Sequence, residues 1–177
     1  DVKNYNVADA YLKLAQDLAQ TLKDERSLAF ANYLFGRYYL GTNAPSKAAQ
    51  RANLAYYWFH ETGNVRYTNR SSLLRLVALR DECGKIGSRF SSFVASIAHE
   101  PDPLLLSETY YEYGQYLLAA KQFAQAKVAF EKSLSCLPFE SLIRPKIANT
   151  YRALATIASK TGQLAMAYQH QQKYSSW

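Results

Sequence analysis

The chain has 177 residues, a hydrophobic content of 49% and a formal net charge of +7 at neutral pH. With only 7 glycines and 5 prolines it lacks the turn residues of a β-sandwich, so the composition favours helices. Its Lys and Arg residues are spread along the chain, and charge alone predicts neither nucleic-acid nor membrane binding. No apolar run approaches the ~20 residues that span a bilayer, and no signal peptide is recognisable. We therefore expect a soluble chain.

Residues 1–24 begin with a predicted amphipathic helix over 1–23. Ala8, Leu12 and Ala15 give this helix a small-large-small pattern at helical spacing, which is typical of the second helix of a packed pair. The first helix of that pair is missing. Residues 1–24 are therefore interpreted either as an N-terminal cap or as the unpaired second helix of a preceding repeat.

Residues 25–63 are predicted to form the first complete helix pair. Gly36 lies among large residues at helical spacing in the first helix, and three alanines spaced four and three apart follow in the second. Pro45 sits where a first-turn proline begins a helix. The large residue expected at Ala52 is absent, and the aromatic run 56–59 follows instead.

Residues 65–100 give the weakest copy of this pattern. Val77 replaces the glycine, while Arg80 and Arg89 occupy places where apolar or small residues are expected. Phe93 is predicted to be the large packing residue of the second helix. We expect looser packing here, or arginine side chains that reach out to solvent, which makes this copy the predicted weak joint.

Residues 103–138 give the clearest copy. Asp102 is a predicted N-cap residue, followed directly by a proline. Gly114 leaves room for a neighbouring helix, and Phe130 is the large residue on the facing second helix, which Pro138 is expected to stop. The full pattern reads Tyr110, Tyr113, Gly114, Leu117, Ala126, Phe130, Ser133 and Pro138.

Residues 145–177 repeat the pattern, with Ala155 at the glycine place and Ala167 at the small-residue place of the second helix. The number of residues from the glycine place to the small-residue place is the same in all four copies. The glycine place itself recurs at nearly equal intervals along the chain. It falls at Gly36, Val77, Gly114 and Ala155. This regularity predicts four helix pairs after the leading helix, or about nine helices in all.

The pattern resembles the tetratricopeptide (TPR) repeat, in which aromatic-x-x-Leu-Gly-x-x-Tyr is followed by Ala-x-x-x-Phe and then Pro. The resemblance implies an all-α, right-handed superhelical solenoid of antiparallel helix pairs, a single domain over 1–177. It also implies that the first helices line a concave groove for a partner. By register, the groove residues are Phe30, Tyr33, Arg37, Leu40, Leu74, Tyr111, Gln115, Asn149, Arg152 and Thr156, with Ala78 and Leu118 beside them.

This mixture of aromatic, amide and guanidinium groups suits an extended peptide or a small ligand with polar and apolar parts. Within the family, a denser set of lysines and asparagines clamps acidic C-terminal peptides. That set is not present here, so chaperone-tail binding is not expected.

The sequence nominates no catalytic, cofactor or metal site. His60, His99 and His170 lack the spacing of a zinc motif, and no phosphate loop, nucleophile elbow or paired-carboxylate motif is present. Cys83 and Cys136 lie far apart in the sequence and belong to no cluster, which leaves a disulfide between them open. We therefore predict a non-enzymatic protein without a cofactor or metal.

Residues 8–27, and Ala167-Tyr168 with Lys173-Tyr174, also resemble TPR segments in the sensor regions of bacterial membrane-bound histidine kinases and LuxR-type regulators. That resemblance implies a periplasmic or cytoplasmic role in signal transduction or transcription regulation, as part of a larger, membrane-anchored protein. The preferred interpretation is a scaffold that binds a protein or peptide. The alternative is an assembly or homodimerisation scaffold that uses the end helices, or a cytoplasmic adaptor. RNA binding rests on net charge alone, and a tyrosine-lined groove argues against it.

Overall fold

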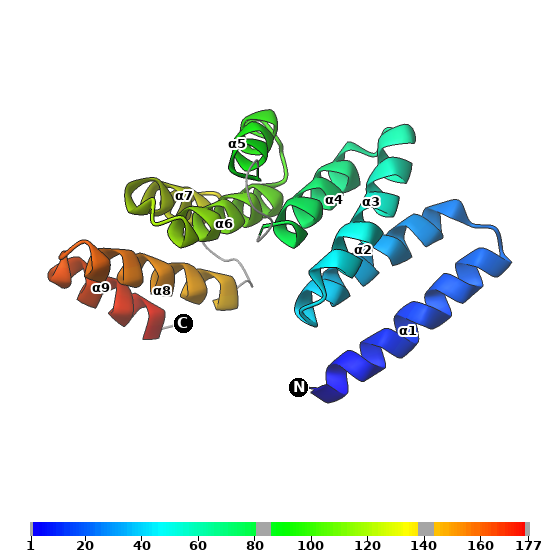
Figure 1. Cartoon of the computed structure of the whole chain (residues 1–177), viewed down its shortest axis with the longest axis horizontal. Helices are drawn as coiled ribbons and strands as arrows, with labels where there is room; N and C mark the ends of the chain where they lie inside the picture. The colour runs from blue at the N-terminus through cyan, green and yellow to red at the C-terminus, as the bar shows by residue number, and fades with distance from the viewer. Residues whose placement is uncertain (1, 81–85, 138–143, 176–177) are drawn as a thin grey trace. The chain divides into compact units, whose positions relative to one another are not determined.

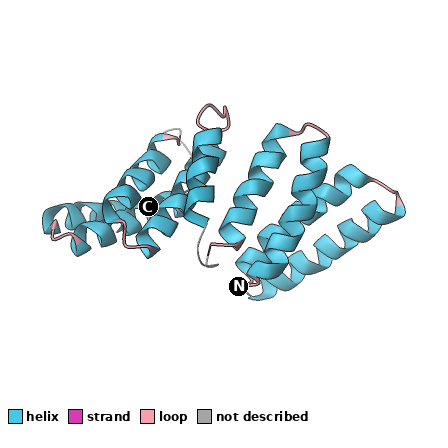
Figure 2. Ribbon diagram, turned by 45° about the horizontal axis from the view of Figure 1, so that its top comes forward, coloured by secondary structure: helices cyan, strands magenta, loops and turns pink. Residues whose placement is uncertain are grey.

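The computed structural model describes residues 2–80, 86–137 and 144–175. Within these ranges nine α-helices follow one another without a strand (Figure 1 and Figure 2). The prediction of an all-α protein with about nine helices is confirmed. No helix in the described ranges is both long and apolar enough to cross a membrane. The helices are α1 (Val2–Thr21), α2 (Glu25–Gly41), α3 (Pro45–Glu61), α4 (Val65–Ala78), α5 (Ile86–Ser96), α6 (Pro103–Ala119), α7 (Phe123–Ser135), α8 (Arg144–Lys160) and α9 (Leu164–Ser175).

The internal contacts of the chain divide it into two compact units, Asp1–Ile86 and Gly87–Trp177. We call them the N-terminal unit and the C-terminal unit. The division falls inside residues 65–100, the copy whose substitutions at the glycine and small-residue places predict a weak joint.

Both units are built by the same serial packing of neighbouring helices (Figure 1). In the N-terminal unit each helix from α1 to α3 packs on the next, and α2 also touches α4. In the C-terminal unit α6 packs on α7, α7 on α8 and α8 on α9, and α6 also touches α8. Short turns such as 42–44 make neighbouring helices antiparallel, as in helical-repeat proteins.

Two helices begin at an aspartate cap. Asp102 Oδ1 accepts hydrogen bonds from the backbone N–H groups of Leu104 and Leu105 at 3.1 and 3.2 Å, which confirms the predicted start of α6. Asp24 caps α2 in the same way, because its carboxylate accepts from the Ser27 N–H at 3.1 Å and from the Ser27 hydroxyl at 2.6 Å. These hydrogen bonds lower the pKa of Asp24.

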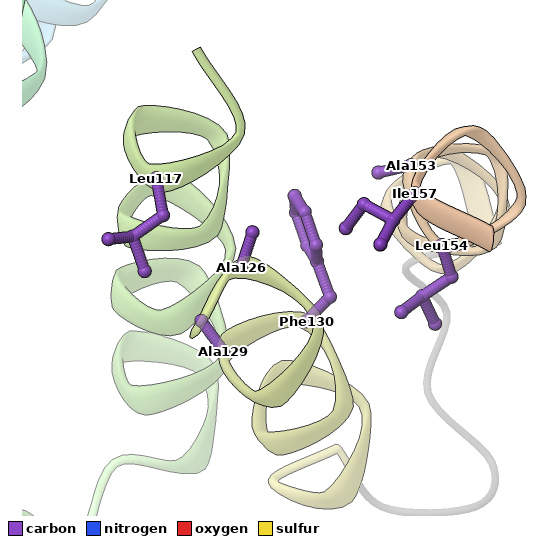
Figure 3. Packing of buried hydrophobic residues seen from close by; sticks show 7 residues of the cluster. All are labelled: Leu117, Ala126, Ala129, Phe130, Ala153, Leu154 and Ile157. Atoms are coloured by element: carbon purple, nitrogen blue, oxygen red, sulfur yellow. The ribbon is translucent and has the colours of Figure 1, made fainter. Parts of the chain in front are cut away.

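Gly114 permits the close packing of α6 and α7. A β-carbon added at this position would lie 2.9 Å from the Phe130 ring, which is tighter than real side chains allow. Phe130 is fully buried, and its ring lies beside Ile157 of α8 (Figure 3). The prediction that Gly114 makes room for the facing helix is confirmed. Pro138, the expected stop, lies outside the described residues, and α7 ends at Ser135.

In the N-terminal unit a different residue fills the space beside the corresponding glycine, Gly36. A β-carbon on Gly36 would lie 2.7 Å from Leu74 Cδ2. Ala52, which stands where the C-terminal unit has Phe130, is fully buried and too small to fill this space. The side chain of Leu74, contributed by α4, therefore takes the position of the missing large residue.

The predicted packing register of α5 is wrong. Phe90, and not Phe93, is the fully buried aromatic residue of this helix. Arg89 is exposed, as expected for an arginine side chain that reaches out to solvent. The Phe90 ring stacks on Tyr113 at 6.0 Å and on Tyr116 at 5.8 Å between ring centroids. Contacts with α6 thus set the register of α5, and the constant step between the helices does not predict which residue of α5 is buried.

Candidate binding surface

The ten predicted groove residues divide evenly between the two compact units. In the C-terminal unit they come from two helices that touch, α6 and α8. Tyr111 and Gln115 lie four residues apart on α6, and Asn149, Arg152 and Thr156 lie three and four residues apart on α8, so each set shares one helical face. We call these five residues, with Glu108 and Lys146 beside them, the α6–α8 surface.

Tyr111 is the aromatic centre of the α6–α8 surface. Its ring meets Phe130 edge to face at 5.8 Å between centroids, so its body is anchored on the core. The Lys146 ammonium lies 5.6 Å from the centroid of the Tyr111 ring and 3.2 Å from Glu108 Oε1. This cation links α6 to α8, because Glu108 and Tyr111 belong to one helix and Lys146 to the other.

Glu108 and Lys146 were missed by the sequence analysis. Each lies three residues before a predicted groove residue, Tyr111 and Asn149 respectively, and so shares a helical face with it. That spacing was the available signal. The pairing across the two helices needed the tertiary structure, because the two side chains lie far apart in the sequence.

The other residues of the surface are polar. Gln115 and Asn149 are half-buried, and their amides can donate to and accept from a peptide backbone. Arg152 and Thr156 are exposed. The Thr156 hydroxyl donates to the Arg152 carbonyl oxygen at 2.9 Å, so its proton is used within α8. Arg152 is thus the cationic group of this surface that is open to an incoming carboxylate.

In the N-terminal unit the predicted groove residues contribute mainly to packing. Tyr33 is 7% exposed and Leu74 is 6% exposed, and both belong to a core cluster with Phe59. Phe30 and Leu40 pack against this cluster, and Arg37 is exposed.

Tyr67 of α4, which the sequence analysis did not single out, closes the aromatic cluster of the N-terminal unit. Its ring lies 4.6 Å from Phe30, 5.6 Å from Tyr33 and 5.1 Å from Phe59, measured between centroids. This cluster occupies space beside the predicted groove face of α2. A partner in this unit would meet Arg37 and the half-buried edges of Phe30 and Leu40.

The described histidines and cysteines form no metal centre. No group of three or more possible ligands occurs among the residues that the structure describes. His170 stacks on Tyr151 at 6.1 Å, and burial lowers its pKa. Burial raises the pKa of the half-buried Cys136 thiol, which stays protonated at neutral pH and is a poor nucleophile. The question of a Cys83–Cys136 pair lies outside the described residues, because it involves Cys83.

Comparison with known proteins supports the fold class. No family model and no curated protein matches the chain. Among solved structures it is similar to the crystal structure of BtubC (BKLC) from P. vanneervenii, with a TM-score of 0.73 and 15% sequence identity. The match covers 98% of this chain and 72% of that chain. At this identity the likeness concerns the fold, and it defines the protein as an all-α protein built like a helical repeat.

Proposed function

We propose that the protein is a non-enzymatic scaffold of the TPR type that binds an extended peptide, and that the α6–α8 surface carries the contact. One observation supports the proposal above all others. Two helices from successive predicted repeats bring an anchored tyrosine, two amides and an exposed guanidinium onto one surface. Rigid aromatic groups and arginine are the residue types that dominate peptide and protein interfaces.

Each group has a role in this proposal. An apolar side chain of the peptide packs against the exposed edge of Tyr111. The amides of Gln115 and Asn149 bond the peptide backbone, and Arg152 pairs with an acidic side chain. Lys146 is already held by Glu108 at 3.2 Å, and it therefore orients Tyr111 rather than binding the peptide.

The test begins with a random peptide library displayed on phage and selected on the purified protein. Selected peptides are expected to bind the Arg152→Ala variant about tenfold more weakly, because truncating a charged contact at the centre of an interface costs about 1–2 kcal/mol. Fluorescence anisotropy measures the dissociation constants. Lys160→Ala is the matched control, because it removes an exposed cation from the same helix outside the surface. Equal affinity of the selected peptides for all three proteins would contradict the proposal.

In the broader proposal, this scaffold is the sensor part of a bacterial regulator. That proposal rests on the resemblance to sensor regions. The parent open reading frame tests it. A membrane-spanning segment beside a kinase or helix-turn-helix module would support the sensor role. An open reading frame that encodes helical repeats alone would favour a free-standing adaptor.

A second candidate function, self-assembly, is favoured by the exposed face of α1. Val7, Tyr11, Leu14 and Leu18 form an apolar stripe on this helix, and they are 55%, 70%, 64% and 57% exposed. The steps along the stripe are four, three and four, which read the same in both directions. A second copy running antiparallel would therefore set Val7 against Leu18 and Tyr11 against Leu14.

Covering this stripe on both copies would bury on the order of 1,000 Å², near the lower limit of a specific interface. We therefore expect weak, concentration-dependent dimers that the Leu14→Glu variant abolishes, because a charge enters the centre of the stripe. Sedimentation velocity at increasing protein concentration measures this. Leu164→Glu is the control, since Leu164 is a 72% exposed leucine of α9 and is not a member of the stripe. A wild-type protein that stays monomeric at every concentration would rule out this candidate.

A further inference from the structure

We propose that a pocket between α5, α6 and α7 binds a small aromatic carboxylate. The pocket has a volume of about 380 Å³ and lies wholly within the C-terminal unit. This volume falls within the roughly 300–1,000 Å³ of small-molecule sites. Its lining residues are Val94, Tyr110, Tyr113, Leu117, Ala124, Gln125, Val128, Ala129 and Lys132.

This pocket is distinct from the peptide surface. Tyr110, Tyr113 and Leu117 line the pocket, whereas Tyr111 and Gln115 belong to the α6–α8 surface. At about 100° per residue, the two sets point to nearly opposite sides of α6. The pocket therefore constitutes a second site, and it does not depend on the proposed peptide binding.

The walls of the pocket are held in place by contacts with the rest of the unit. The Tyr113 hydroxyl lies 3.0 Å from Ser91 Oγ of α5, and the Tyr113 ring stacks on the fully buried Phe90. Leu117 and Ala129 are buried and form the floor, while Val128 is 52% exposed at the mouth. A ring that enters therefore meets pre-formed aromatic and aliphatic walls, so little ordering is required on binding.

The single charged side chain that lines the pocket is Lys132. Its ammonium lies 5.4 Å from the centroid of the Tyr110 ring, and the structure gives it no carboxylate partner among the described residues. Glu131, its neighbour in the sequence, lies instead 4.0 Å from Lys127. An apolar hollow beside one open ammonium is complementary to a ligand with an aromatic ring and one carboxylate.

The experiment uses indole-3-propionate as the probe and its neutral amide, indole-3-propionamide, as the matched ligand. Isothermal titration calorimetry on the full chain measures both dissociation constants. The Lys132→Met variant keeps an apolar stem but removes the charge, and it is expected to bind the carboxylate about five- to tenfold more weakly. Lys127→Met is the control, because it removes a charge from the same helix outside this pocket.

A double comparison shows whether the charge itself is recognised. On the wild-type protein the amide should bind about five- to tenfold more weakly than the carboxylate, and on Lys132→Met the two probes should bind equally. Val128→Trp, a change at an exposed position that fills the mouth, should abolish binding of both probes. Three outcomes would overturn the proposal: no binding by the wild-type protein at millimolar probe, equal affinity of both probes for it, or unchanged affinity of Val128→Trp.

Discussion

Replacing Phe130 with alanine is expected to lower the free energy of unfolding of the C-terminal unit by about 3–5 kcal/mol, among the largest effects of any single substitution in this unit. Phe130 is fully buried, and it joins three helices by contacting Gly114 and Tyr111 of α6 and by sharing a core cluster with Ile157 of α8. Truncation removes these contacts and leaves a cavity, because packed helices relax only partly around it.

Urea unfolding followed by circular dichroism measures the change for Phe130→Ala. Val128→Ala is the matched control on the same helix, because Val128 is 52% exposed and its truncation should cost about 0.5 kcal/mol or less. If Phe130→Ala cost no more than this control, Phe130 would not be the residue that holds α6, α7 and α8 together.

Replacing Gly114 with valine is expected to destabilise the same unit by about 3 kcal/mol. The new β-carbon would lie 2.9 Å from the Phe130 ring, and the ring has no free space to enter because it is fully buried. The better helix propensity of valine offsets only a few tenths of a kcal/mol. The two helices must therefore separate or shift along each other.

A double-mutant cycle isolates this steric cause. In a Phe130→Ala background the valine gains room, so Gly114→Val should cost less there than in the wild-type protein, with a coupling energy of about 1–3 kcal/mol. Thermal and urea unfolding of the four proteins give the cycle. Strict additivity of the two single changes would mean that the glycine serves some purpose other than the approach of the Phe130 ring.

Features that depend on neighbours in the sequence were predicted well. The Asp102 cap, the proline start of α3 and the glycine at position 114 follow from local rules of backbone geometry and hydrogen bonding. The helical spacing of apolar residues likewise indicated an all-α protein, since the period of the pattern is itself a property of the helix.

Features that depend on packing partners were not predictable from one sequence. The spacing of the repeats assigned Phe93 to the core of α5, but stacking on Tyr113 and Tyr116 places Phe90 there instead. The docking of α5 depends on the side chains of α6 that it meets, so the constant step between repeats does not set its register. For the same reason nothing in the sequence showed that Leu74 would fill the space over Gly36.

The candidate sites likewise combine features that the sequence predicts with features that depend on packing partners. The sequence by itself determined which residues share a helical face, and its resemblance to the TPR repeat implied that Tyr111, Gln115 and Arg152 are possible contacts. Only the tertiary structure decided that Tyr33 is buried within an aromatic cluster and that Lys146 lies beside Glu108. The physical reason is that helical periodicity is set by adjacent residues, whereas burial and cross-helix pairing depend on which helices come together.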